Sequence, residues 1–158
     1  MQIGIDIGGT TINLGLVDGG RLASVKTVPS FTPDATKAET LDYLSEAIRQ
    51  VLVPEVQGIG IGVPTIVDPA NGIVYQAVNI RSWDCVHLKD ELEARFNLPV
   101  RVNNDSNCFA LGAAARLDRV YPVMVGITLG TGLGMGVVKD GELFSGTRCG
   151  VGELGSAQ

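Results

Sequence analysis

The residues best suited to chemistry stand near the start of the chain, in a glycine turn that follows an aspartate. Asp6 precedes Gly8, Gly9 and Thr10, and apolar residues alternate on both sides, which predicts two strands within residues 2–18. Adjacent glycines can take positive φ and carry no Cβ, so backbone N–H groups and the Thr10 hydroxyl could approach an anion closely. A carboxylate beside such a site is favourable when a divalent cation lies between them, which makes Asp6 a candidate magnesium ligand through water. The alternative is a plain hairpin with a solvated Asp6.

A second glycine turn, Gly130-Thr131-Gly132, also lies between two apolar segments. Residues 120–138 repeat the plan of residues 2–17, an apolar strand, a turn and an apolar return strand, which indicates an internal duplication. If the two halves face each other, both turns can hold the phosphates of one nucleotide. Neither turn is a Walker loop or a dinucleotide-binding fingerprint. A pair of ordinary hairpins is the alternative.

Asp105 is the candidate catalytic base. It lies between a strand predicted at residues 100–103 and a helix predicted at residues 106–117, and a carboxylate there could take the proton of an attacking hydroxyl. Aspartate is also a preferred N-cap residue, which is the alternative. The preceding Asn104 favours catalysis, because an amide beside a carboxylate suits a polyhydroxyl substrate. Glu153 is either part of a glycine-flanked, positioned loop or a solvated acid.

Trp83, the single tryptophan, could stack on a sugar ring or anchor its own loop. Three widely spaced cysteines, Cys85, Cys108 and Cys149, are typical of reduced, buried thiols in a cytosolic protein. Cys85 and His87 lack a second pair of ligands, so a zinc site is not expected.

The elements that must position these residues follow from periodicity. Apolar residues at helical spacing predict helices over residues 36–53 and 88–96, and Thr36 with Glu39 fits a capping box. Residues 57–64 alternate glycine with Ile or Val, which predicts a strand whose second face carries no side chains. Further strands are expected over residues 21–28, 72–76 and 142–144. We therefore expect an α/β sheet in a first domain, residues 1–119, and the start of a second, incomplete domain, residues 120–158.

Composition narrows the function further. The 158 residues are 45% hydrophobic with a net charge of −5 and no basic stripe, which argues for a packed core and against nucleic acid. No apolar run approaches the roughly 18 residues of a membrane span, and no signal peptide is recognisable, so we expect a cytoplasmic protein. A half-built second sheet leaves open edges, so we expect a homodimer or higher self-association.

Taken together, the motifs resemble the ROK family of bacterial sugar kinases and sugar-responsive repressors, in the actin/hexokinase-like ATPase superfamily. The residues that carry the resemblance are Asp6-x-Gly8-Gly9-Thr10, Asn104-Asp105, Thr128-Leu129-Gly130-Thr131-Gly132 and Gly152-Glu153-x-Gly155. The loop Asn79-Ile80-x-x-Trp83 resembles that family's sugar-side loop. The resemblance implies a ribonuclease-H-like (actin-like ATPase) domain with the opening strands of a second, similar domain.

The resemblance also implies a role for each site residue in an ATP-dependent kinase of the glucokinase type. Asp105 would be the base, ATP with Mg²⁺ the phosphoryl donor and a hexose the acceptor. Three residues would bind sugar hydroxyls: Asn79, Asn104 and Glu153. Two elements would bind phosphates: Asp6, Gly8, Gly9 and Thr10 in the first, and Gly130, Thr131 and Gly132 in the second.

Two departures from the family pattern keep other functions open. Ser156 stands where the family has a histidine that contacts sugar and, in many members, zinc. The adenine-binding half of the second domain is not in this sequence, so we expect a truncated or partial form. The alternatives are a non-catalytic sugar-binding or interaction module and the effector domain of a ROK-type regulator.

Overall fold

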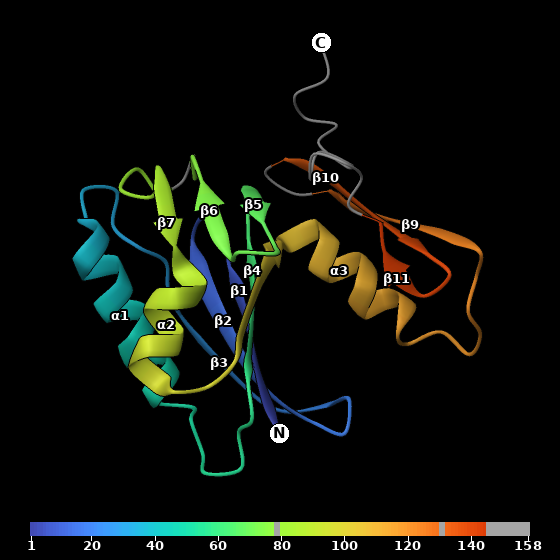
Figure 1. Cartoon of the computed structure of the whole chain (residues 1–158), viewed down its shortest axis with the longest axis horizontal. Coiled ribbons are helices and arrows are strands. Elements are labelled where there is room, and N and C mark those ends of the chain that lie inside the picture. Colours follow the sequence, from blue (N-terminus) through green and yellow to red (C-terminus); the bar gives the residue numbers. More distant parts are fainter. Residues whose placement is uncertain (78–79, 130–131, 145–158) are drawn as a thin grey trace. The chain divides into compact units, whose positions relative to one another are not determined.

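The computed structural model describes residues 1–77, 80–129 and 132–144 (Figure 1). The chain divides into two compact units, Met1–Asn103 and Asn104–Gln158. In the first unit the elements are β1 (Gln2–Ile7), β2 (Thr11–Asp18), β3 (Arg21–Pro29), α1 (Lys37–Arg49), β4 (Ile59–Val63), β5 (Ile66–Asp68), β6 (Ile73–Tyr75), β7 (Cys85–His87), α2 (Leu88–Phe96) and β8 (Val100–Asn104), whose last residue opens the second unit. The second unit continues with α3 (Asp105–Ala114), β9 (Val123–Leu129), β10 (Leu133–Lys139) and β11 (Glu142–Leu143). No helix in the described ranges is long and apolar enough to cross a membrane.

The first unit is built on a five-stranded sheet with the order β3-β2-β1-β4-β8. β1 pairs antiparallel with β2 and parallel with β4, and β2 pairs antiparallel with β3. The register places Asp6 between Asn13 on β2 and Gly62 on β4. The mixture of a meander with helix-connected strands confirms the predicted α/β class.

Alternation of isoleucine with glycine gives this sheet two different faces. Ile3, Ile5 and Ile61 belong to one buried core with the apolar residues of α1 and α2, which lie over that face (Figure 1). On the other face a Cβ added to Gly4 or Gly60 would meet no atom within 4 Å. The predicted strand with one bare face is therefore confirmed.

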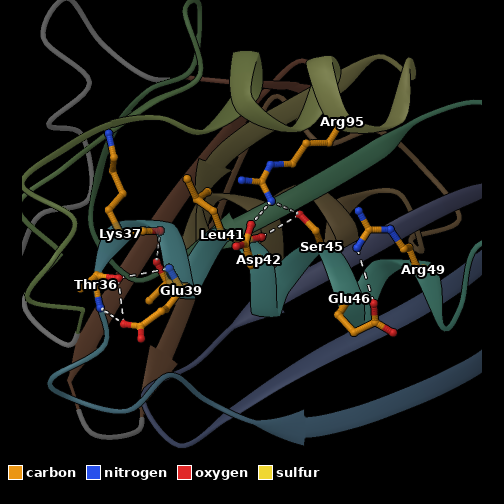
Figure 2. A network of polar contacts seen from close by, with 10 residues as sticks. Thr36, Lys37, Glu39, Leu41, Asp42, Ser45, Glu46, Arg49 and Arg95 are labelled. Carbon is orange, nitrogen blue, oxygen red and sulfur yellow. Dashed lines mark hydrogen bonds and ion pairs between the residues drawn. The ribbon is translucent and has the colours of Figure 1, made fainter.

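α1 begins with the predicted capping box (Figure 2). The Thr36 hydroxyl accepts from the Glu39 backbone N–H at 3.3 Å, and the Glu39 carboxylate accepts from the Thr36 backbone N–H at 2.8 Å. The backbone hydrogen bond and the Thr36 hydroxyl together hold the pKa of the Glu39 carboxyl below its ordinary value. The helix ends at Arg49, four residues earlier than expected, and Gln50 is its C-cap.

Arg95 joins the two helices of the first unit (Figure 2). Its Nη1 donates to Asp42 Oδ1 at 2.6 Å and to Ser45 Oγ at 3.0 Å. Ser45 is buried on α1 and donates its own hydroxyl to the Leu41 carbonyl at 2.7 Å. The guanidinium therefore holds α2 against α1 through one charged and one buried polar partner.

A small sheet, β5-β6-β7, adds to the same core. Its antiparallel register aligns Val67, Val74 and Val86, and all three are buried. β6 lies within the strand predicted over residues 72–76, whereas β5 and β7 are not predicted from the sequence.

In the second unit α3 packs closely on the β9–β10 hairpin. A Cβ on Gly126 would lie 2.8 Å from Ala110 Cβ, and one on Gly136 would lie 2.6 Å from the Ser106 carbonyl oxygen. Glycines on the strands and the small Ala110 on the helix together allow this close packing. The helix ends at Ala114, three residues earlier than expected.

The opposite face of the β9–β10 hairpin is apolar and exposed. The register sets Leu129 beside Leu133 and Ile127 beside Met135. The exposed large apolar residues on these strands are Val123, Val125, Ile127, Leu129 and Leu133. We call this set the outer hairpin face.

The Arg95 contact predicts that two ion pairs involving α1, Arg95–Asp42 and Arg49–Glu46, contribute unequally to stability. Arg95→Ala should lower the free energy of unfolding by about 1 kcal/mol, because a charge-assisted bond is lost while Ser45 keeps its bond to Leu41. Glu46→Ala removes only the exposed 3.5 Å ion pair with Arg49 and should change the free energy of unfolding by less than about 0.5 kcal/mol. Urea unfolding with equal m-values measures both, and equal effects of the two variants would contradict the assignment.

Candidate functional site

The first candidate element is the turn between β1 and β2. The Gly8 N–H donates to the Thr11 carbonyl at 2.9 Å, which closes the turn. Ser30, just after β3, donates its hydroxyl to the Gly8 carbonyl at 2.6 Å and its N–H to the Thr10 carbonyl at 2.8 Å. Three consecutive strands therefore hold this turn in place.

The first turn requires glycine at residue 8 because a side chain would not fit there, and not because of the backbone φ. Among the described glycines, positive φ occurs at residues 19, 20, 72 and 141, and at neither Gly8 nor Gly9. The expectation that these two use positive φ is thus wrong. A Cβ on Gly8 would lie 3.0 Å from the Thr11 carbonyl oxygen, so a side chain there would push the turn apart.

Asp6 belongs to a row of polar side chains across three strands. Asn13 Nδ2 donates to Asp6 Oδ2 at 3.5 Å, and Thr27 Oγ1 donates to Asn13 Oδ1 at 2.8 Å. The row lies on the face of the sheet that carries glycine, and Asp6 is exposed there. Sequence reasoning missed Asn13 and Thr27, although an assumed hairpin register would have set Asn13 opposite Asp6.

The chemistry of this element fits a phosphate with its magnesium ion. Mg²⁺ is commonly held by one or two carboxylates, waters and substrate phosphates, so a single exposed aspartate is a sufficient protein ligand. Successive backbone N–H groups in a turn can bind an anion, although the Gly8 N–H of this turn is bonded to the Thr11 carbonyl. The described residues contain no group of three or more His, Cys, Asp or Glu that could cage a metal ion alone.

The second candidate element is the start of α3. The N-cap is Asn104, whose Oδ1 accepts from the N–H groups of Ser106 at 3.0 Å and Asn107 at 3.3 Å. Asp105 is the first residue of the helix, and the cap position considered for it is taken by Asn104. The Asp105 carboxylate still accepts a hydrogen bond from the first turn of its own helix. Because Oδ1 of Asn104 serves the cap, any contact of this residue with a sugar hydroxyl would use its amide nitrogen.

Ser106 connects Asp105 to the end of β9. Its N–H and its hydroxyl reach Asp105 Oδ1 at 2.7 Å and 3.2 Å. The same hydroxyl lies 3.1 Å from Thr128 Oγ1, two residues before the second glycine turn. Sequence reasoning missed Ser106, since nothing local distinguishes it from any first-turn serine.

Several predicted site residues lie outside the described residues: Asn79, Gly130, Thr131 and Glu153. Gly132 precedes β10 and is exposed, and a Cβ there would meet no atom within 4 Å. The structure therefore groups Asp6, Gly8, Gly9 and Thr10 on one hairpin, and Asn104 with Asp105 at one helix start. The meeting of these two groups around one substrate stays a prediction.

Trp83 is fully buried, and its indole N–H donates to Thr40 Oγ1 at 2.8 Å. Of the two open readings, loop anchoring is therefore correct and sugar stacking is wrong. The expectation of buried thiols is also wrong for Cys85 and Cys108, which are exposed because Val86 and Ala110 take the inward positions of their elements. Cys149 lies outside the described residues.

Comparison with known proteins shows which family and which kinase this chain resembles. The sequence pattern of the ROK family matches residues 2–158. N-acetyl-D-glucosamine kinase of Pasteurella multocida is 36% identical over 161 residues, covering 100% of this chain and 52% of the relative. The chain spans about half the length of the relatives it matches.

Solved structures agree with this likeness. A ROK family glucokinase from Streptomyces griseus, in complex with glucose and AMPPNP, superposes with a TM-score of 0.86 at 34% identity, covering 99% of this chain and 50% of that one. A ROK family transcriptional regulator, a homologue of the Escherichia coli MLC protein, superposes with a TM-score of 0.85 at 25% identity, covering 99% and 41%. ROK sugar kinases have actin-like ATPase folds, so the predicted fold class is confirmed. The match along nearly the whole sequence shows that this chain belongs to the ROK family.

Proposed function

We propose that this chain is the part of an ATP-dependent sugar kinase of the glucokinase type that binds the hexose and the donor phosphates. The observation that carries the proposal is the Ser106 bridge, because it ties the Asp105 carboxylate to the strand that leads into the second glycine turn. A base beside a phosphate-binding turn is the arrangement that transfer of a phosphoryl group to a hydroxyl requires. The two kinases named above are an N-acetyl-D-glucosamine kinase and a glucokinase, so a hexose of either kind is the proposed acceptor.

Each residue has a defined role in the proposed reaction. Asp105 accepts the proton of the attacking sugar hydroxyl while that oxygen bonds to the γ-phosphorus and the bridging oxygen to the β-phosphate leaves. Asn79, Asn104 and Glu153 hydrogen-bond the other hydroxyls. Mg·ATP supplies the phosphoryl group and neutralises its charge when bound.

The two glycine turns bind the phosphates in this proposal. Asp6, Gly8, Gly9 and Thr10 form the first phosphate element, with Asp6 contacting Mg²⁺ through water. Gly130, Thr131 and Gly132 form the second. Catalysis then depends on positioning and on electrostatic stabilisation rather than on covalent chemistry by the protein.

The proposal includes a domain boundary near residue 120 and a cytoplasmic location. The β9–β10 hairpin repeats the antiparallel plan of β1 and β2, which supports a second, related domain that opens at residue 120. The compact units divide at a different point, after Asn103, because α3 packs on β9 and β10.

A second candidate function is sugar sensing without catalysis. The likeness to a ROK family transcriptional regulator favours it, and so does Ser156 at the position where the resemblance predicts histidine. Calorimetry with hexoses in the absence of nucleotide, followed by a phosphorylation assay, separates the two. Hexose binding without product formation would support the sensor.

Asp105→Asn tests the proposed base. The amide cannot take a proton, so phosphoryl transfer should fall by at least about 100-fold while hexose affinity changes little. A single-turnover assay with protein in excess and detection of the sugar phosphate by mass spectrometry measures the loss. Asp118→Asn makes the same charge change at an exposed position and should have no effect. Undiminished activity of Asp105→Asn would remove this residue as the base.

Asp6 and Asn13 allow a graded test of the first phosphate element. Asp6→Asn should weaken Mg·ATP binding about 100-fold, and Asn13→Ala, which removes the amide donor to Asp6 and the acceptor for Thr27, about tenfold. Asp18→Asn, at the far end of β2, is the matched control. NMR titration at several Mg²⁺ concentrations measures even millimolar affinities. Equal affinity of Asp6→Asn and the native chain would contradict the assignment.

We propose further that the chain associates with itself through the outer hairpin face. The apolar side chains of this face are exposed, and β9 is the edge strand of its described sheet, so both its surface and its edge lack a partner within that sheet.

Ile127→Lys tests this association. A charge in the middle of the face should raise the dissociation constant at least about tenfold, because it would be buried without a partner. Sedimentation velocity across a concentration series measures the change, and Val25→Lys on β3 is the exposed control. A native chain that stays monomeric at all concentrations would contradict self-association.

A further inference from the structure

The turn between β5 and β6 contains the one Asn-Gly pair of the sequence, Asn71-Gly72. In such a pair the glycine nitrogen can attack the side-chain carbonyl carbon of the asparagine, since glycine has no side chain to hinder the approach. The nitrogen loses its proton and bonds to Cγ, and the side-chain amide leaves with a proton as ammonia. Water then opens the cyclic imide at either carbonyl and yields aspartate or isoaspartate. The sequence therefore holds a site at which spontaneous deamidation is chemically favoured.

The fold requires glycine at this site. Gly72 has a φ of +66°, and a Cβ there would collide with the side chain of Lys89 on α2. The Gly72 carbonyl accepts from the Lys89 N–H at 3.2 Å, which joins the turn to the start of α2. The residue that favours cyclisation cannot be exchanged, so protection against deamidation must come from its neighbours.

Asp68 binds both groups that would react. Its carbonyl accepts from the Gly72 N–H at 2.7 Å, and Gly72 is buried, so the nitrogen that must lose its proton is already engaged. Its carboxylate Oδ2 accepts from Asn71 Nδ2 at 2.7 Å, although Asn71 itself is exposed. The side chain of Asn71 must give up this bond before its Cγ can turn to the Gly72 nitrogen.

The Asp68 carboxylate also fixes the backbone of the turn. Its Oδ1 accepts from the N–H groups of Ala70 at 3.0 Å and Asn71 at 3.3 Å, a common way for aspartate to stabilise a turn. These hydrogen bonds, with that of the Asn71 side chain foremost, hold the pKa of the Asp68 carboxyl below its ordinary value. Hydrogen bonds to a charged acceptor are the stronger kind. The turn therefore opens rarely, and a reaction that needs the open turn is slowed in proportion.

We propose that Asn71-Gly72 is a latent deamidation site and that Asp68 keeps it closed. Deamidation removes the Nδ2 donor and sets a second carboxylate beside that of Asp68, so the product no longer forms the bond that closed the turn. The inference is independent of the proposed function, because every contact that carries it lies in the β5–β6 turn or at the start of α2.

Two substitutions in the full 158-residue chain test the role of Asp68. Asp68→Ala removes every side-chain acceptor in the turn. Asp68→Asn keeps an oxygen for the two backbone N–H groups and sets an amide nitrogen where Asn71 needs an acceptor. Asp34→Ala, which removes an exposed carboxylate from the loop before α1, is the matched control. A synthetic peptide of residues 66–75 gives the rate in the absence of the fold.

Peptide mapping by mass spectrometry measures the conversion of Asn71 during incubation in neutral buffer, at a temperature where thermal unfolding shows the samples to be folded. The native chain should convert at least about tenfold more slowly than the peptide, and Asp68→Ala at least about tenfold faster than the native chain, because charge-assisted hydrogen bonds are lost. Asp68→Asn should lie between these two rates, and Asp34→Ala should match the native chain.

Three results would overturn the proposal. A native chain that converts as fast as the peptide would show that the fold gives no protection. Conversion of Asp68→Ala at the native rate would exclude Asp68 as the protecting residue, and so would equal acceleration in Asp34→Ala. Should Asp68→Ala fail to fold, Asp68→Asn takes its place, and conversion of that variant at the native rate contradicts the proposal.

Discussion

The fold of the first unit depends on one constraint, the alternation along β1 and β4 of buried Ile or Val with glycine or a polar residue. Ile3, Ile5 and Ile61 must leave water together, and each buried isoleucine contributes about 1.5–3 kcal/mol. Their burial holds α1 and α2 on one face of the sheet. The same alternation leaves the other face bare at Gly4 and Gly60, and this is the face that carries Asp6. Core and site are thus two consequences of a single pattern.

Glycine acts in a second way at both candidate elements, by allowing backbone and side chains to approach. At Gly8 it lets the first turn close on the Thr11 carbonyl. At Gly134, an added Cβ would collide with the Ser106 and Thr128 hydroxyls. The contact of these two hydroxyls therefore requires a position without a side chain on β10. Both elements are shaped as much by missing side chains as by the polar groups themselves.

The sequence was sufficient wherever the signal is local. The 3.6-residue period and the Thr36 capping box place α1, and the two-residue period places β1 and β4. Contacts between residues distant in sequence could not be predicted from local patterns. The Asn13–Asp6 contact requires the hairpin register, and the Trp83–Thr40 hydrogen bond requires the tertiary structure. Only Asp105 was considered from the sequence as the cap of α3, but asparagine has the same preference for that position, and in the structure Asn104 takes it.

The buried Trp83 has a practical consequence. Because it is the only tryptophan in the chain, excitation at the red edge of the protein absorption band addresses one indole at one known place. That indole is shielded from solvent, donates one hydrogen bond and lies against a phenylalanine ring. Its emission wavelength and quenching by small solutes therefore report on the loop that it anchors, without any attached dye. Trp83 is therefore an intrinsic fluorescent probe of this loop.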